Sequence, residues 1–285
     1  MARQYKRKYT FTVTADGESR TITGLRVEFN VTKSLRSFPN LAKITLYNLS
    51  DETQAALESK FATVTLNAGY EGYEKLLFKG EIRNTTLLKQ GVDSKVTVYA
   101  GDGQRDWESS FVNLTFDKKV KINAVIEKVA RTMTYTSVEK VDGIANYSDK
   151  LRGQTLSGST KDVLDSLAKN YDFQWSIQDG VFQAIPNNEI KDIDLAVKIN
   201  QETGMIGSPT ITDQGVEVKT LLNPAIKPDG AIIIESTSAN ISKGNLFFRE
   251  VKETRAIGQY KVYEITHTGD THSDEWSSNI LGIPI

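Results

Sequence analysis

The first hundred residues alternate apolar and polar side chains in short runs, which is the pattern of half-buried β-strands. The clearest run is Leu25–Val31, in which every second residue is apolar, and Ala42–Tyr47 repeats the pattern. The period then changes, because Ser50 is a suitable N-cap and acidic residues follow it. We therefore expect a near-closed antiparallel sheet with one short helix over residues 53–60, since closure removes exposed strand edges.

The middle third follows a helical period instead. Apolar residues in Ile122–Val129 recur at helical spacing, and a second helix is expected to begin near residue 160 and to stop near Asn170. After it, Phe173–Ile177 and Val181–Ile185 flank a Gln-Asp-Gly turn. Two helices and a tight hairpin predict a small α+β unit.

The last third returns to extended segments that are separated by glycine and proline. Turn residues at this spacing favour a barrel or sandwich over a parallel sheet. These segments are Pro209–Thr212, Gly215–Val218, Ala231–Glu235 and Gly258–Ile265. The sequence therefore predicts a mostly β protein with an α+β insert. Two antiparallel β-barrel domains, residues 1–105 and 191–285, are expected to flank the small α+β domain at residues 106–190.

Composition narrows the classes of partner and chemistry. The 285 residues carry a formal net charge of −1, so the chain lacks the overall field that draws a protein onto nucleic acid. The absence of cysteine excludes disulfides, thiolate metal sites and cysteine nucleophiles. No apolar run is long enough to span a bilayer, and the polar N-terminus does not match a secretion signal. We expect no stable membrane insertion.

The two histidines of the chain lie close together in the sequence, in the one cluster of residue types that could carry catalysis. His267, Asp270 and His272 offer two imidazoles and a carboxylate, which are ligand types for zinc, nickel or iron. Their spacing is not that of a helical His-Glu-x-x-His site, and the Gly-Asp step before Thr271 indicates a turn. A structural turn is the preferred interpretation, with a bound ion as the alternative, and we predict no metal site.

Other catalytic constellations are missing from the sequence. No spacing selects a pair of carboxylates for glycoside hydrolysis, and there is no Gly-x-Ser-x-Gly elbow. Gly153–Gly158 lacks the Gly-Lys-Ser/Thr ending of a phosphate-binding loop, and we interpret it as a surface loop. We predict that the protein is not an enzyme, with no catalytic residues and no cofactor.

Aromatic residues could form either a stacking platform for sugars or bases, or buried anchors and subunit contacts. Trp175 alternates with apolar neighbours and is predicted to be core. Phe247 and Phe248 are the preferred candidates for an intersubunit contact, and replacing both with serine should impair assembly more than folding. Other candidates for a platform are Trp107, Trp276, Tyr70 and Tyr73.

Several short strings, in this order and spacing, resemble the baseplate hub proteins of tailed bacteriophages. In the first third these strings are Asn40–Ser50, Leu66–Tyr70 and Leu77–Ile82. In the last third they are Gly204–Pro209, Gly215–Val216, Leu221–Pro224, Gly258–Val262, His267–Thr271 and Trp276. Each string is weak alone, and the resemblance rests on their succession along nearly the whole chain.

This resemblance implies a virion structural protein with two tail-tube-like β-barrels per chain. Three chains would form a homotrimeric ring with pseudo-sixfold symmetry that joins the tail tube to the central spike and encloses a DNA ejection channel. The implied partners are tail tube or distal tail proteins, the spike protein and the tape-measure protein, with DNA only in transit. Assembly would take place in the host cytoplasm, and the finished protein would lie in the tail baseplate.

Two alternatives remain open from the residues. One is a monomeric carbohydrate- or receptor-binding tail module, which would show an exposed aromatic platform. The other is a metal-dependent hydrolase that uses His267, Asp270 and His272. Such an enzyme would need stoichiometric metal and would lose activity on His267→Ala.

Overall fold

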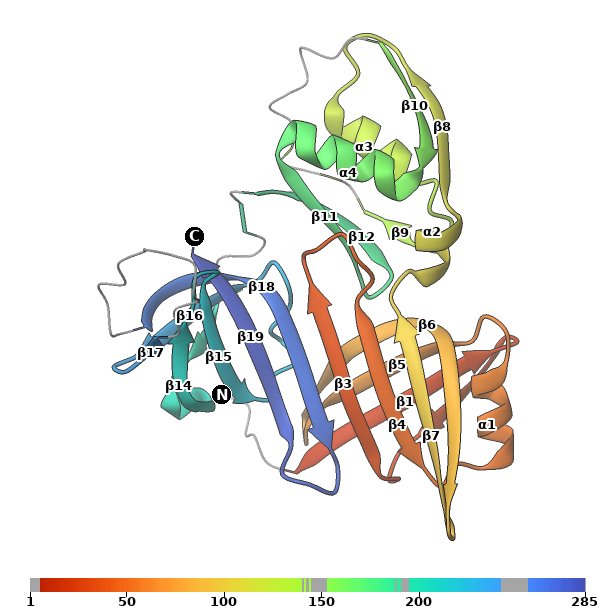
Figure 1. Ribbon diagram of the computed structural model, residues 1–285, viewed down its shortest axis with the longest axis vertical. Helices are drawn as coiled ribbons and strands as arrows, with labels where there is room; N and C mark the ends of the chain where they lie inside the picture. Colours follow the sequence, from red (N-terminus) through yellow and green to blue (C-terminus); the bar gives the residue numbers. More distant parts are fainter. Residues whose placement is uncertain are drawn as a thin grey trace.

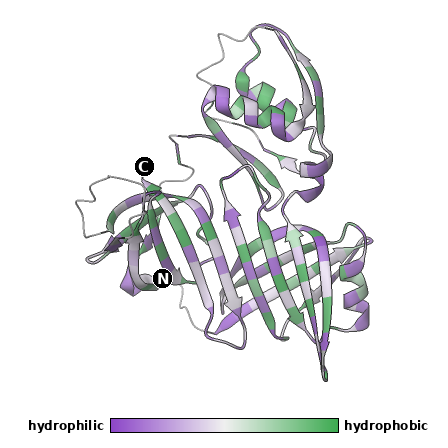
Figure 2. Cartoon of the chain, in the orientation of Figure 1, coloured by the Kyte–Doolittle hydropathy of each residue, from purple (hydrophilic) through white to green (hydrophobic). Residues whose placement is uncertain are grey.

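The computed structural model describes residues 6–139, 141, 144, 153–187, 189–190, 195–241 and 256–284. Two β-rich halves lie side by side, and the α+β insert stands on one end of them (Figure 1). Along most strands, apolar and polar residues alternate (Figure 2). No helix in the described part of the chain is long and apolar enough to cross a membrane.

The N-terminal half contains seven strands and one helix, and the predicted cap of that helix is confirmed. Its elements are β1 (Arg7–Ala15), β2 (Glu18–Ile22), β3 (Val27–Ser34), β4 (Leu41–Tyr47), α1 (Asp51–Glu58), β5 (Thr63–Tyr70), β6 (Tyr73–Gln90) and β7 (Asp93–Gly101). The Ser50 hydroxyl accepts a hydrogen bond from the Thr53 amide at 3.4 Å. Strand β6 is 18 residues long, and a register shift between Ile82 and Asn84 interrupts its pairing with β7.

The insert contains the predicted helices and hairpin. Its elements are α2 (Gln104–Ser109), β8 (Phe111–Phe116), α3 (Ile122–Ala130), β9 (Ser137–Val138), β10 (Gln154–Ser159), α4 (Thr160–Tyr171), β11 (Phe173–Gln178) and β12 (Val181–Pro186). The prediction of a surface loop at Gly153–Gly158 is wrong, because the residues from Gln154 onward form β10, which pairs with β8. Leu156 and its partner Leu114 pack against the insert's core, and this contact holds the two strands in place.

The C-terminal half is again built of strands. Its elements are β13 (Val197–Ile199), the 3₁₀ turn η3 (Gln201–Thr203), β14 (Met205–Ile211), β15 (Val216–Leu221), β16 (Ala231–Ser236), β17 (Asn240–Ile241), β18 (Ala256–Asp270) and β19 (Trp276–Pro284). The 15-residue strand β18 pairs with β16, β19 and β3. It thereby joins the C-terminal half to the N-terminal half.

One 14-stranded sheet runs through both halves. Its main path is β17-β14-β15-β19-β18-β3-β4-β7-β6-β5-β1-β2, with β16 and β13 attached to β18. The mostly β fold with an α+β insert is confirmed. Among the described strands, pairing closes neither half into a separate ring. The edge of β3 that closure of the N-terminal half would need is paired with β18, and the outer strands of the C-terminal half, β13 and β17, do not pair with each other.

Three hydrophobic cores correspond to the three parts of the fold. The first core lies in the N-terminal half but includes Leu222 and Trp276 from the C-terminal third. The second lies in the insert and contains Trp175, which is 2% exposed, so its predicted burial is confirmed. The third lies between β15, β16, β18 and β19. The two β halves therefore share side-chain packing as well as a sheet.

Candidate functional site

One face of the continuous sheet is mostly polar from β14 to β6, with Leu41 and Leu281 as apolar members, and we call it the polar face. Because residues directly opposite each other in a sheet point to the same side, the strand registers assign its members. They include Thr210, Glu217, Lys219, Asn279, Thr266, Thr268, Asn30, Thr32, Lys43, Thr97, Tyr99, Asn84 and Thr86. An antiparallel sheet with one packed face and one hydrated face fits this alternation.

Hydroxyl and amide groups bond to each other across the strands of the polar face. Thr32 and Thr266 join β3 to β18 through their hydroxyls at 3.2 Å. Asn30 donates to the Thr268 hydroxyl at 3.3 Å. Such cross-strand pairs each contribute a few tenths of a kcal/mol to about 1 kcal/mol. They hold the seam between the halves without burying the surface.

A hollow of about 850 Å³ lies over the N-terminal part of the polar face, and Phe61 and Arg105 are among the residues that line it. The Arg105 guanidinium lies 4.5 Å from the ring centres of both Phe61 and Tyr135. Glu81 lies 3.9 Å from the Arg105 Nε, and burial raises the pKa of this carboxyl. No sequence signal marks this cluster, because its members come from separate elements.

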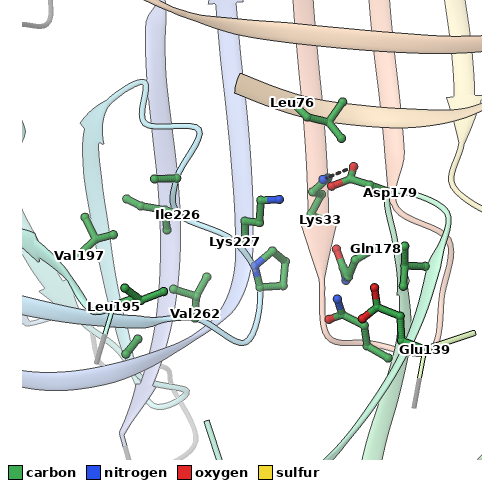
Figure 3. Close-up of a pocket in the computed structure, with 16 residues that line it drawn as sticks. Lys33, Leu76, Glu139, Gln178, Asp179, Leu195, Val197, Ile226, Lys227 and Val262 are labelled. Atoms are coloured by element: carbon green, nitrogen blue, oxygen red, sulfur yellow. Dashed lines mark hydrogen bonds and ion pairs between the residues drawn. The ribbon is translucent and has the colours of Figure 1, made fainter. Parts of the chain in front are cut away.

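A cleft of about 480 Å³ separates the insert's hairpin from the C-terminal half (Figure 3). The insert wall carries polar side chains, among them Gln178 and Asp179. The opposite wall carries apolar side chains, among them Val197, Ile226 and Val262. This mixed lining presents no convergent set of catalytic groups.

Behind this cleft, a group that we call the buried joint ties the turn of the insert's hairpin to the N-terminal half. It consists of Lys33, Asn40, Asp102, Gln178 and Asp179. The Lys33 Nζ lies 2.5 Å from the Asp179 carboxylate, and both side chains are nearly buried. Asp102 accepts hydrogen bonds from the amides of Asp179 and Gly180. Asn40 donates to the Ile177 carbonyl and to the Gln178 side chain, each at 2.9 Å.

The titration of Asp102 should make stability depend on pH. Burial, reinforced by the neighbouring charge of Asp179, raises the pKa of Asp102 from 3.8 to about 7 despite Lys33. The folded protein therefore holds a proton that the unfolded chain releases above about pH 4. Stability from this group is present at low pH and is lost as pH rises through about 7.

We expect Asp102→Asn to remove this fall in the free energy of unfolding between about pH 4 and pH 7. Urea denaturation at a series of pH values measures it. The substitution also removes a hydrogen bond, but this loss does not change the slope of the free energy of unfolding against pH. A pH curve parallel to that of the wild type would therefore contradict the assignment of this fall to Asp102.

The candidate metal ligands do not converge. His267 is buried on the core side of β18, where its Nδ1 lies 2.8 Å from the Ser278 hydroxyl. Burial, with a smaller contribution from Lys33, lowers the pKa of His267 to about 3. Asp270 binds Arg26 at 2.9 Å and accepts from the His272 amide at 2.8 Å. Within the residues that the structure describes, no three histidine or acidic side chains could hold a metal ion.

The aromatic candidates are mostly packed. Trp276 is 2% exposed, and Trp107 stacks on Trp175 with ring centres 4.9 Å apart. Phe247 and Phe248, the predicted interface residues, lie outside the described residues. These tryptophans therefore offer no exposed stacking platform.

The comparison with protein families and the comparison with curated sequences gave different results. A family model described as Baseplate hub gp41 matches residues 10–247. No curated protein sequence matches the chain significantly.

Similar solved structures come from tail and secretion proteins. The 43 kDa tail protein of prophage MuSo2 from Shewanella oneidensis has a TM-score of 0.62 at 9% identity, over 96% of each chain. A tail protein from Neisseria meningitidis MC58 has a TM-score of 0.61 at 7% identity, over 97% of this chain and 96% of that one. The E. coli c3393 protein, a component of the type VI secretion system that is structurally similar to T4 tail proteins gp27 and gp5, has a TM-score of 0.61 at 9% identity. That match covers 96% of this chain and 76% of the other. At these identities the likeness is one of fold.

Proposed function

The chain belongs to the baseplate hub gp41 family, and from this premise we propose that three copies form a ring that joins the tail tube to the central spike. The observation that carries the proposal is the polar face, because it runs unbroken across both β halves of one chain. A sheet that is packed on one side and hydrated on the other suits the wall of an aqueous channel. Closed cyclic symmetry would also prevent open-ended polymerisation.

Two β halves per chain offer a route from threefold to sixfold symmetry. Three copies would place six similar β units around the axis, facing six units of the tube on one side and a threefold spike on the other. The shared packing of the two halves through Trp276 and Leu222 supports this arrangement, because it keeps both units of a chain in one rigid orientation.

The chemistry of the polar face suits passage rather than retention. Its hydroxyl and amide groups carry no charge, and its lysine and glutamate residues are interspersed. A long polyanion such as DNA binds through the neutralisation of many phosphates by clustered cations. A mixed lining would let the tape-measure protein and then DNA move through without tight binding.

The three cores support the division into residues 1–105, 106–190 and 191–285 that the sequence predicts. In the ring, the insert would stand away from the channel and contact other baseplate proteins. The protein would act by shape and interfaces, without catalysis, in the virion's tail baseplate after assembly in the host cytoplasm.

Light scattering of the purified protein tests this proposal. We expect a mass three times that of the 31.7 kDa chain, and negative-stain images of the same fraction should show rings with a central channel. A monomer at every concentration, alone and with spike or tube protein added, would contradict the ring. That result would favour the alternative of a monomeric binding module.

A further inference from the structure

The end of the β6–β7 hairpin lies at an edge of the sheet, and we call its residues 83–95 the arm. Strand β7 still pairs with β4 as far as Lys95 and Tyr47, so only residues 89–94 extend past the neighbouring strand. Strand β5 pairs with β6 only as far as Glu81, so β6 pairs with β7 alone from Asn84 onward. The tip of the arm projects from the lower edge of the N-terminal half (Figure 1). It also exposes large apolar side chains: Leu87 is 43% exposed, Leu88 53% and Val92 fully exposed.

These features indicate that the arm has a partner. A strand edge with free amide and carbonyl groups is a template for pairing with another chain, and soluble proteins cover or blunt such edges. Exposed apolar residues that gather along one unpaired strand edge mark an interaction surface. Among the described residues, nothing pairs with the outer edge of β6 after Ile82.

The opposite side of the polar face offers a complementary surface. Ile206 on β14 is 41% exposed, and its register partner on β15 is Lys219, a member of the polar face. Leu88 pairs with Lys95 and lies on the same face as Thr86. An exposed apolar side chain therefore stands at each end of one continuous face.

Charge is also complementary between the two ends. Arg83 and Lys89 on the arm are exposed, and so are Asp213 and Glu217 at the β14–β15 turn. Within the described part of the chain, none of these four forms an ion pair. A head-to-tail contact between copies must join unlike surfaces, and these two ends are unlike in sign.

We propose that the arm of one copy docks against β14 and β15 of a second copy, with Leu88 against Ile206 and Arg83 and Lys89 facing Asp213 and Glu217. The contact continues the polar face from copy to copy. It rests on the proposed ring and specifies how that ring closes.

The absence of cysteine from the chain allows a clean test by cross-linking. Leu88→Cys and Ile206→Cys are made as separate proteins, mixed, allowed to exchange subunits, and treated with a short bis-maleimide. We expect a cross-linked dimer in the mixture and little in either protein alone, because the contact joins unlike surfaces. Glu18→Cys on β2, the strand at the other end of the sheet path, is the matched control and should not cross-link to Ile206→Cys.

Charge reversal gives a second readout. Arg83→Glu with Lys89→Glu should weaken self-association about tenfold, and Asp213→Lys with Glu217→Lys should do the same. Combining all four substitutions should restore association, which a loss of folding could not do.

The outcomes separate the two proposals. Rings that form without the 88–206 cross-link would overturn this interface and leave the hub function standing. Cross-linking of the β2 control in place of the arm would overturn it in the same way. A protein that never forms rings would overturn both.

Discussion

Replacing Lys33 with alanine is expected to lower the free energy of unfolding by about 3–5 kcal/mol, because it leaves the Asp179 carboxylate nearly buried without its cation. Lys33 itself is 3% exposed, so water cannot take its place at low cost. Urea denaturation at neutral pH measures the loss. We also expect faster protease cleavage around the insert, because the buried joint holds its hairpin.

A surface ion pair provides the matched control. Lys198 and Glu235 lie 2.8 Å apart but are about half exposed, so Lys198→Ala should cost no more than about 1 kcal/mol. Adding Asp179→Asn to Lys33→Met should recover part of the loss, because the Asp179 carboxylate is then no longer left nearly buried without its cation. A Lys33→Ala variant as stable as Lys198→Ala would contradict the role of the joint.

The loss on Lys33→Ala should also shrink at acid pH. Lys33 counteracts part of the rise in the pKa of Asp102, so removing it raises that pKa further. Near pH 4 the Asp102 carboxyl is protonated in the folded state with or without Lys33, so removing the lysine leaves less charge unpaired than at pH 8. An equal loss at pH 4 and pH 8 would show that the charge of Asp102 does not contribute to it.

Local signals explain which elements could be predicted from the sequence. Three predicted features depend on residues that are close in the chain. They are the cap at Ser50, the helical period from Ile122 and the Gln-Asp-Gly turn of the β11–β12 hairpin. Strand β10 was missed because Gln154–Ser159 is rich in glycine and polar residues. Its partner β8 lies some 40 residues earlier, so no local pattern indicates the pairing.

The candidate site depends on contacts that no local pattern carries. The polar face needs β3 beside β18, more than 200 residues apart in the chain. Lys33 follows Val31 on the core side of an alternating strand, but no nearby residue indicates its partner, because its amine meets Asp179 from the insert. The histidine cluster shows the opposite case, in which closeness in the sequence does not bring side chains together. His267 and Asp270 are near in sequence, but the strand sends His267 into the core while Asp270 binds Arg26.

Replacing Trp276 with alanine is expected to cost about 3–5 kcal/mol of unfolding free energy. Its ring meets the Phe29 ring edge-on at 5.2 Å, and its Nε1 donates to the Gly69 carbonyl at 3.2 Å. This side chain comes from β19 but belongs to the core of the N-terminal half. The substitution therefore leaves a cavity where the two halves join. Thermal unfolding followed by circular dichroism measures the loss.

Trp107→Ala is the matched aromatic control, because Trp107 stacks on Trp175 inside the insert. If the two β halves unfold as one unit, Trp276→Ala should lower the midpoint of a single transition for both, while Trp107→Ala should affect the insert first. The distinction bears on the ring: a hub that must hold six β units in fixed orientation needs the two units of each chain to be rigidly joined. Trp276→Ala should then reduce the trimer fraction even at temperatures where the monomer stays folded. Unchanged assembly in a folded Trp276→Ala variant would show that the shared sheet alone, without this core contact, sets the orientation of the halves.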